Sequence, residues 1–275
     1  MAVVGHVEWV QFARVEHVPV AGEVVHATDP FEEPAGGGGV AAVQLARLAG
    51  GATLFTAFGD DEAGRRSRAR LTELGVQVHA VTVELPTRRA VTLLDGNGER
   101  TITTLGRRLD PPADLLERVL EDGAGFDGIY FTAGTPDALR WARRGAKVLT
   151  ASPRAVHALG HGVPIDALIL SNNDEHEVHL AARFEDEAAV VVRTEAAHGG
   201  TYVKHDGKSG KWPGSRPPGA VVDGYGCGDS FAAGATFGLA AGLGLARALA
   251  LAARCGAVCA TGHGPYERQL RAQDL

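Results

Sequence analysis

The sequence contains little cysteine, no long apolar run and no cluster of basic residues, and each absence excludes a class of protein. Its three cysteines are Cys227, Cys255 and Cys259. This odd, sparse set does not form a disulfide framework and is typical of a reducing compartment, so we expect a cytoplasmic protein. No stretch of about 18 apolar residues is present, which argues against a membrane-spanning helix. The net charge is −6 without any run of lysine and arginine, so neither nucleic acid nor an anionic membrane is an expected partner.

The remaining composition is that of an ordinary globular protein. Hydrophobic residues make up 45% of the 275 residues and charged residues 22%. This length is within reach of a single α/β domain with a small appendage, so we expect one domain over residues 1–275.

Strand and helix patterns alternate along most of the chain. Four glycines at residues 36–39 are followed by apolar residues at helical spacing, and Gly50-Gly51 ends this predicted helix. A short buried strand is predicted at residues 52–58, and a second helix ends near Leu74. Further strands are predicted at 129–133, 147–150, 167–170 and 189–193. This alternation predicts a mainly parallel sheet covered by helices on its faces.

Two regions interrupt the alternation with β-rich sequence. In residues 6–27 two extended runs flank Pro19 and Gly22, and in residues 87–105 the turn Asp95-Gly96-Asn97-Gly98 joins two extended runs as a hairpin. Together they predict a small β appendage, which is either a lid that excludes water from a site or a structural extension of the sheet. A third hairpin is predicted around residues 201–212.

The segment with the clearest chemistry is residues 221–234, VVDGYGCGDSFAAG. Its glycines allow a tight turn and a close approach of a ligand to the backbone, and a helix of small residues follows from Ser230. The first amides of a helix have no intrahelical partner and carry partial positive charge, which suits a phosphate. Asp229 lies at this helix start. Alone it would be read as a helix cap, but beside an anion site it can accept a hydroxyl proton during phosphoryl transfer.

This segment resembles the C-terminal signature of the ribokinase-like (PfkB) carbohydrate kinases, close to Asp-Thr-Thr-Gly-Ala-Gly-Asp-Ser/Thr-Phe. The matching residues are Asp223, Gly226, Gly228, Asp229, Ser230 and Phe231, while Gly224, Tyr225 and Cys227 differ. The resemblance implies a three-layer α/β sandwich with a mainly parallel central sheet and a small β lid. It also implies that ATP donates its γ-phosphoryl group to a hydroxyl of a small sugar-like acceptor, with Asp229 as general base. The amides of Gly226, Cys227, Gly228 and Asp229 then form the anion hole.

Other stretches match the family in the same order. The glycines at 36–39 with Leu45-Ala46-Arg47-Leu48 resemble its N-terminal signature, and Gly59-Asp60-Asp61 continues it. Asn172-Asn173-Asp174-Glu175 resembles the family's Asn-x-x-Glu, which implies that Glu175 organises Mg²⁺ and that Asn172 lies near the phosphates. The nucleotide contacts implied in addition are Thr194, Gly199, Ala253 and Gly256, with Ala196 replacing a family glycine. The family also binds a monovalent cation near the position of Asp223 in some members.

The departures from the family pattern fall on the acceptor side. Where the family often has an aspartate this chain has Val10, with Glu8 two residues earlier, and a family asparagine is replaced by Val40. The family's Asp-x-Asn-x-Arg reads Thr150-Ala151-Ser152-Pro153-Arg154. The acceptor contacts implied by position are Glu8, Gly36, Gly37, Val40 and Asp229. Because hydrogen bonds that discriminate between hydroxylated ligands are lost, we expect an acceptor other than ribose.

Three alternatives remain at this point. A Rossmann-type dehydrogenase would need Gly-x-Gly-x-x-Gly directly after its first strand, whereas residues 5–8 read GHVE there. A ribokinase-like protein that only binds nucleotide would gain little from Asp229. A nucleoside kinase would share the same motifs. An exposed lid edge could also pair with a second copy of the chain, which makes a homodimer through the lid an open expectation.

Overall fold

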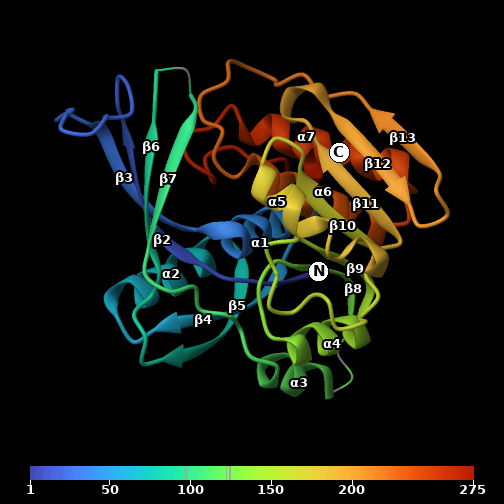
Figure 1. Cartoon of the computed structure of the whole chain (residues 1–275). Helices are drawn as coiled ribbons and strands as arrows, with labels where there is room; N and C mark the ends of the chain where they lie inside the picture. Colours follow the sequence, from blue (N-terminus) through green and yellow to red (C-terminus); the bar gives the residue numbers. More distant parts are fainter. Residues whose placement is uncertain (97, 122, 124) are drawn as a thin grey trace.

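The structure is a computed structural model that describes residues 1–96, 98–121, 123 and 125–275, and a nine-stranded sheet forms its centre (Figure 1). The strand order is β13-β12-β11-β10-β9-β8-β1-β4-β5, parallel from β11 to β5, with β12 antiparallel to both of its neighbours. The strands are β1 (Ala2–Val4), β4 (Ala52–Gly59), β5 (Val76–Val83), β8 (Phe126–Phe131), β9 (Ala146–Ala151), β10 (Ala167–Ser171), β11 (Val190–Thr194), β12 (Gly200–Lys204) and β13 (Ser209–Trp212).

Helices cover both faces of this sheet, so the expected three-layer α/β sandwich is confirmed. One face carries α1 (Gly36–Ala49), α2 (Glu62–Glu73), α6 (Cys227–Ala240) and α7 (Leu245–Cys259), and the other carries α3 (Asp114–Glu121), α4 (Pro136–Gly145) and α5 (Glu175–Ala181). In β1, Val3 packs into the first core while Ala2 and Val4 pack into the second, and all three are fully buried. A strand buried on both faces shows no polar alternation, as the sequence of β1 illustrates.

Both glycine-rich helices begin earlier than the sequence predicted. The four glycines of residues 36–39 are the first turn of α1 itself. A Cβ atom on Gly38 would lie 2.6 Å from the carbonyl oxygen of His6 and 2.8 Å from the carbonyl carbon of Gly5, so only glycine lets the helix start this close to β1. Similarly, α6 begins at Cys227 rather than at Ser230.

A second, four-stranded sheet of order β3-β2-β6-β7 forms the lid, which projects beside the main sheet (Figure 1). It consists of β2 (Glu8–Arg14), β3 (Thr28–Ala35), β6 (Arg89–Leu94) and β7 (Arg100–Leu105). The β6–β7 hairpin was expected, although Asn97 of its turn lies outside the described residues. The strand that pairs with β2 lies beyond the expected boundary at residue 27. The sequence of β3 contains two prolines, which are unusual in a strand, but β3 lies at the edge of the sheet, where proline is tolerated.

The lid is tied to the body near the base of β6. The Asp61 side chain caps α2 and accepts hydrogen bonds from the backbone nitrogen of Thr87 at 2.9 Å and from its hydroxyl at 2.7 Å. On the other side of the lid, Arg70 of α2 forms an ion pair with Glu33 of β3 at 2.8 Å. The Gly59-Asp60-Asp61 motif therefore holds Thr87, the residue before Arg88, in place.

None of the helices described is long and apolar enough to cross a bilayer.

Candidate active site

The site lies where the strand order of the main sheet reverses direction. From β1 the chain proceeds to β4 on one side, whereas β8 lies on the other side. Ligands of open parallel sheets bind at such a switch point, beyond the carboxyl ends of the strands. Here Gly5 and Thr132 follow β1 and β8, and a Cβ atom on Gly5 would collide with the Thr132 side chain. The start of α1 is packed over the same point.

The start of α6 has the backbone geometry that the anion site expected from the glycines would need. Gly226 precedes the helix with φ 79°, and the first intrahelical hydrogen bond runs from the amide of Ser230 to the carbonyl of Gly226 at 2.9 Å. The amides of Cys227, Gly228 and Asp229 come before that bond, so helix geometry leaves them free for an anion. Gly228 is exposed, and a Cβ atom there would meet no atom within 4 Å. Space for a phosphoryl group therefore exists at this helix end.

Asp229 is directed toward the start of α1. A Cβ atom on Gly37 would lie 3.1 Å from Asp229 Oδ1 and 2.9 Å from Thr132 Oγ1, so these three residues meet at the switch point. Burial raises the pKa of Asp229 to about 6, against the opposing charges of Arg154, His6 and Arg100. The residue nevertheless keeps partial exposure to solvent. A carboxylate with this pKa, reachable from solvent and beside free amides, suits a general base at neutral pH.

The turn before α6 couples the starts of the two helices. The buried Asp223 accepts hydrogen bonds from the amides of Tyr225 at 2.7 Å and Gly264 at 3.0 Å. The hydroxyl of Tyr225 in turn accepts a hydrogen bond from the amide of Gly36 at 3.4 Å. Burial raises the pKa of Tyr225 above its ordinary range, so this hydroxyl stays protonated. Sequence reasoning treated Tyr225 only as a departure from the family pattern, because its partner lies 189 residues away.

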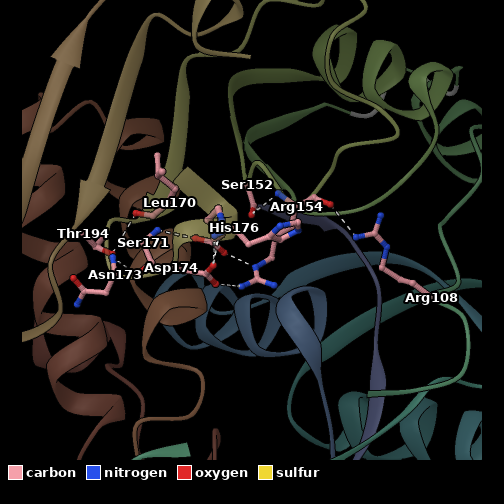
Figure 2. Close-up of polar contacts among 10 residues, drawn as sticks. Arg108, Ser152, Arg154, Leu170, Ser171, Asn173, Asp174, His176 and Thr194 are labelled. Carbon is pink, nitrogen blue, oxygen red and sulfur yellow. Dashed lines mark hydrogen bonds and ion pairs between the residues drawn. The ribbon is translucent and has the colours of Figure 1, made fainter. Parts of the chain in front are cut away.

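Arg154 connects the end of β9 to the start of α5 (Figure 2). Its guanidinium forms an ion pair with Asp174 at 2.6 Å and another with Glu177. Although burial opposes its charged form, Glu177 and Asp174 raise the pKa of Arg154. The charge of Arg154 also acts on Asp229 and on Glu8. The charge of this arginine therefore links Asp229 to the segment that carries the expected nucleotide-side motif.

At the start of α5, the acid whose charge acts on Asp229 is Glu177. Glu177 is buried, and its second oxygen accepts a hydrogen bond from the amide of Ser171 at 2.7 Å. Glu175, which the resemblance assigned to the metal, is exposed. Asp174 caps the helix. Asp174 and Glu177 also have the spacing of the Asn-x-x-Glu motif, shifted two residues along the chain and with aspartate in place of asparagine. This second register was the signal that could have identified Glu177 from the sequence.

The expected nucleotide residues lie near the ends of β10 and β11 and on α7. The amide of Asn172 donates to the carbonyl of Thr194 at 2.8 Å, which brings these two residues together. Gly256 of α7 lies against the start of α6, since a Cβ atom there would be 3.2 Å from the carbonyl oxygen of Cys227; Ala253 lies one turn earlier and is partly exposed. A Cβ atom on Gly199 would collide with the backbone of Trp212, so this glycine is required by the fold.

Ala196, which stands where the resemblance implies a glycine, adopts a backbone conformation that glycine favours. Its φ is +50°, in the left-handed region that glycine adopts at little cost. The turn between β11 and β12 is therefore of the kind the glycine would form, at the expense of strain in this alanine.

On the acceptor side, the structure separates the expected residues. Val40 is fully buried in the core, so it does not line the site as its position in the motif implied. Gly36 and Gly37 lie at the start of α1, and Glu8 is 6% exposed beside them. Two residues that the sequence did not identify as acceptor contacts lie against Glu8: His6 Nε2 is 3.5 Å from its Oε1, and Arg88 forms an ion pair with it at 3.2 Å.

The residues present fit a water-bridged Mg²⁺ rather than a caged metal. Across the described ranges, no group of three or more His, Cys, Asp or Glu side chains could hold an ion by itself. Mg²⁺ that bridges nucleotide phosphates needs only one or two carboxylates and keeps several waters. Glu177 and Asp174 carry carboxylate oxygens of this kind, and in the structure both are paired with Arg154.

Two surface hollows of about 480 and 340 Å³ lie away from these residues. The larger is bounded by Phe58, Arg68 and their neighbours between α2 and the sheet, and the smaller by residues around Phe126 and Lys147. Neither contains Asp229, Gly228 or Glu8. The candidate site is therefore defined by its free amides, its acid and its topological position, and not by the volume of a surface hollow.

Comparisons with known proteins agree with this geometry. A family model described as pfkB family carbohydrate kinase matches residues 1–117 and 165–271. A ribokinase from Dictyostelium discoideum is 30% identical over 108 residues, which span 38% of this chain and 34% of that protein, about a third of its length.

Solved structures match over nearly the whole chain. A microbiome-derived acarbose kinase superposes with a TM-score of 0.80 at 21% identity, covering 99% of this chain and 96% of that one. A ribokinase from Arabidopsis thaliana, complexed with ribose and ATP, superposes with a TM-score of 0.73 at 17% identity, covering 99% and 96%. These structures establish the ribokinase-like fold.

Proposed function

Since the chain belongs to the pfkB family of carbohydrate kinases, we propose that it transfers the γ-phosphoryl group of ATP to a hydroxyl of a small sugar-like acceptor, with Asp229 as the general base. The observation that carries this proposal is the junction of Asp229, the free amides of α6 and Gly37 at the switch point of the sheet. The ATP in the matched Arabidopsis ribokinase supports the choice of donor.

In this mechanism, the chain's own residues position two reactants and stabilise charge. The Asp229 carboxylate accepts the proton of the acceptor hydroxyl, which makes the oxygen nucleophilic. The amides of Cys227, Gly228 and Asp229 bind the oxygens of the transferred phosphoryl group as negative charge develops on them. When bound, Mg²⁺ supplies further neutralisation of the phosphate charge. We propose that Glu177, rather than the exposed Glu175, orients its water shell, because the charge of Glu177 acts on Asp229.

The departures around Val10 and Val40 support an acceptor other than ribose. Both valines are fully buried, so the chain does not present the family's acceptor side chains at these positions. A panel of pentoses, hexoses, disaccharides and nucleosides assayed for ADP release would rank the acceptors. We expect ribose to rank below at least one other sugar.

The test of the mechanism is the comparison of the wild type with Asp229→Asn. We expect kcat to fall about 10²–10⁴-fold, as for loss of a general base, while ATP binding is retained. The measurement is ADP release in the presence of the preferred acceptor, with ATP binding followed by calorimetry. Equal turnover by the two proteins across the acceptor panel would contradict the assignment of Asp229.

A further inference from the structure

The three cysteines lie on two helices that pack against each other, α6 and α7 (Figure 1). Cys227 is the first residue of α6, and Cys259 is the last residue of α7. Cys227 Sγ lies 3.9 Å from the carbonyl oxygen of Asp223, and Cys259 Sγ lies 3.5 Å from that of Tyr225. Two thiols from different helices therefore lie against the same short turn.

The side chains of this pair also contact each other. A hydrogen bond from Cys259 has the largest effect on the pKa of Cys227 and lowers it. A Cβ atom on Gly226, the residue before Cys227, would lie 3.7 Å from Cys259 Sγ. A disulfide needs Cβ atoms about 3.5–4.5 Å apart and sulfur atoms about 2 Å apart. The pair therefore reaches this geometry by a small movement of the start of α6.

The two thiols differ in exposure and in the charges around them. Cys227 keeps partial exposure to solvent, whereas Cys259 is fully buried. Cys227 lies at a helix N-terminus, and the charge of Arg100 also lowers the pKa of its thiol, against the effect of burial. The hydrogen bond to Cys227 and burial raise the pKa of Cys259. Cys227 is therefore the thiolate that an oxidant meets first, and Cys259 supplies the second sulfur.

The position of the third cysteine excludes it from this chemistry. A Cβ atom on Gly234 would lie 2.7 Å from Cys255 Sγ, so this thiol faces the middle of α6 rather than its start. Burial raises the pKa of Cys255 to about 12. Cys255 lies one turn before Cys259 on α7, where Cβ atoms are about 5–6 Å apart, too far for a disulfide within the helix.

We propose that Cys227 and Cys259 are an oxidation site, at which a peroxide forms a reversible disulfide that distorts the start of α6. The Cys227 thiolate attacks one oxygen of hydrogen peroxide, which gives a sulfenic acid and releases hydroxide. The sulfur of Cys259 then displaces the hydroxyl group of the sulfenic acid, which leaves with the Cys259 proton as water. A dithiol returns two electrons and restores both thiols. In a reducing compartment such bonds are transient and act as redox sensors.

The effect of this bond on phosphoryl transfer rests on the proposed kinase function. Formation of the bond brings the sulfur atoms to about 2 Å and draws Cys227 toward the end of α7. The amide of Cys227 is the first of the three proposed to bind the phosphoryl group, and Asp229 lies two residues further along the same turn. Because a displacement of about 1 Å in a site can cost about 10²-fold in rate, we expect the disulfide to lower kcat by about tenfold or more.

Peptide mapping tests the bond itself. Trypsin leaves Cys255 and Cys259 on one peptide, so the map uses Cys255→Ala. This variant is treated with hydrogen peroxide in the absence of nucleotide and is alkylated without reduction. We expect the Cys227 and Cys259 peptides to be linked within one chain and to separate after dithiothreitol. Thiols that stay free, Cys227 oxidised to sulfinic acid beside a free Cys259, or a link only between two chains would overturn the inference.

ADP release in the presence of acceptor, measured after the same treatment, tests the consequence. The wild type and Cys255→Ala should lose kcat by about tenfold or more and recover it with dithiothreitol. Cys259→Ala is the matched variant, because it also replaces a buried cysteine of α7. Without a second thiol it should form no linked peptide, and prolonged peroxide should take Cys227 to sulfinic acid, which dithiothreitol does not reverse.

The two measurements separate the disulfide from the kinase function. If Cys259→Ala did not fold, the peptide map and the recovery of Cys255→Ala would decide the inference. Full activity of the linked protein would overturn the effect on the site. Absence of transfer by the fully reduced wild type would overturn the proposed function, and the peptide map would still decide whether the bond forms.

Discussion

As the proposed general base, Asp229 faces opposing demands, because a base must be ionised while burial favours its protonated form. With a pKa of about 6, the ionised fraction rises as the pH passes upward through that value. We therefore expect kcat/KM for the acceptor to rise from pH 5 to a plateau above pH 7, in a profile measured with saturating ATP. The charged groups that act on this acid are Arg154, His6 and Arg100, which lower its pKa, and Glu177, which raises it.

Arg154→Met extends this experiment to the cause of the pKa. Because Arg154 has the largest charge effect opposing burial, its loss should move the midpoint of the profile to higher pH. Arg140→Met is a suitable control, since Arg140 lies on α4 and pairs with Asp137. A midpoint that stays the same in Arg154→Met and in the control would contradict this role.

The same pKa has a consequence for stability. The folded-state pKa of Asp229 is raised above its unfolded value, so its contribution to stability is greatest at low pH and declines as the pH rises through about 6. At pH 8 we expect the free energy of unfolding of Asp229→Asn to exceed that of the wild type by about 1 kcal/mol, after allowance for the partial exposure of the side chain. Thermal unfolding at pH 8 and pH 4 measures this, and the gap should close at pH 4. A destabilised Asp229→Asn at pH 8 would contradict it.

The sequence predicted some site residues and not others for a clear reason. Asp229 and Gly228 lie in one short segment, where motif and helix start are local properties. Arg154 and Glu177 are 23 residues apart, and the charge of His6 acts on Asp229 from the opposite end of the sequence. Contacts of this kind depend on strand order, which one sequence does not specify.

At the scale of secondary structure elements, a substitution at Gly228 distinguishes the stability of α6 from its role in the proposed chemistry. A Cβ atom there would meet no atom within 4 Å, and alanine is a better helix former than glycine. We expect Gly228→Ala to raise the free energy of unfolding by about 0.5–1 kcal/mol and to reduce kcat at least tenfold, because the new methyl group occupies the space for the phosphoryl oxygens.

Thermal unfolding and ADP release measure these two effects of Gly228→Ala. Gly51→Ala is the control, because Gly51 follows α1 with equally open space around its Cβ position and is remote from the site. If Gly228→Ala retained full activity, the amides of α6 would not bind the phosphoryl group.

Element starts were the least predictable part of the fold. The helices α1 and α6 were found, but their glycine turns were assigned to the preceding loops, because glycine usually weakens a helix. The structure explains their place: Gly37 and Gly38 are required by the close approach of Thr132 and His6. Strand β3 was missed because its prolines are tolerated only at a sheet edge, which is a property of the neighbours rather than of the segment.

At the scale of the whole molecule, the alternation of strands and helices was enough to predict the layers, but not how the lid is joined to them. Phe31 of β3 stacks on Phe12 of β2 with ring centroids 4.6 Å apart and contacts His263 at 4.4 Å. Phe12 meets Tyr225 edge-on at 4.8 Å. These aromatic contacts connect the lid to the turn before α6 and to the segment after α7, three parts of the chain that no local pattern relates.

This connection leads to a prediction about coupling. A lid that excludes water favours transfer to the acceptor over hydrolysis of ATP. We expect Phe31→Ala to weaken the lid contacts by about 0.5–1.5 kcal/mol, to raise the KM of the acceptor and to increase the ratio of ADP formed to acceptor phosphorylated. Val24→Ala is the control, since Val24 is 83% exposed in the lid. The ratio is measured by quantifying both products in one reaction. An unchanged ratio in Phe31→Ala would mean that water is excluded by the acceptor and the helix starts alone, without help from the aromatic contacts of the lid.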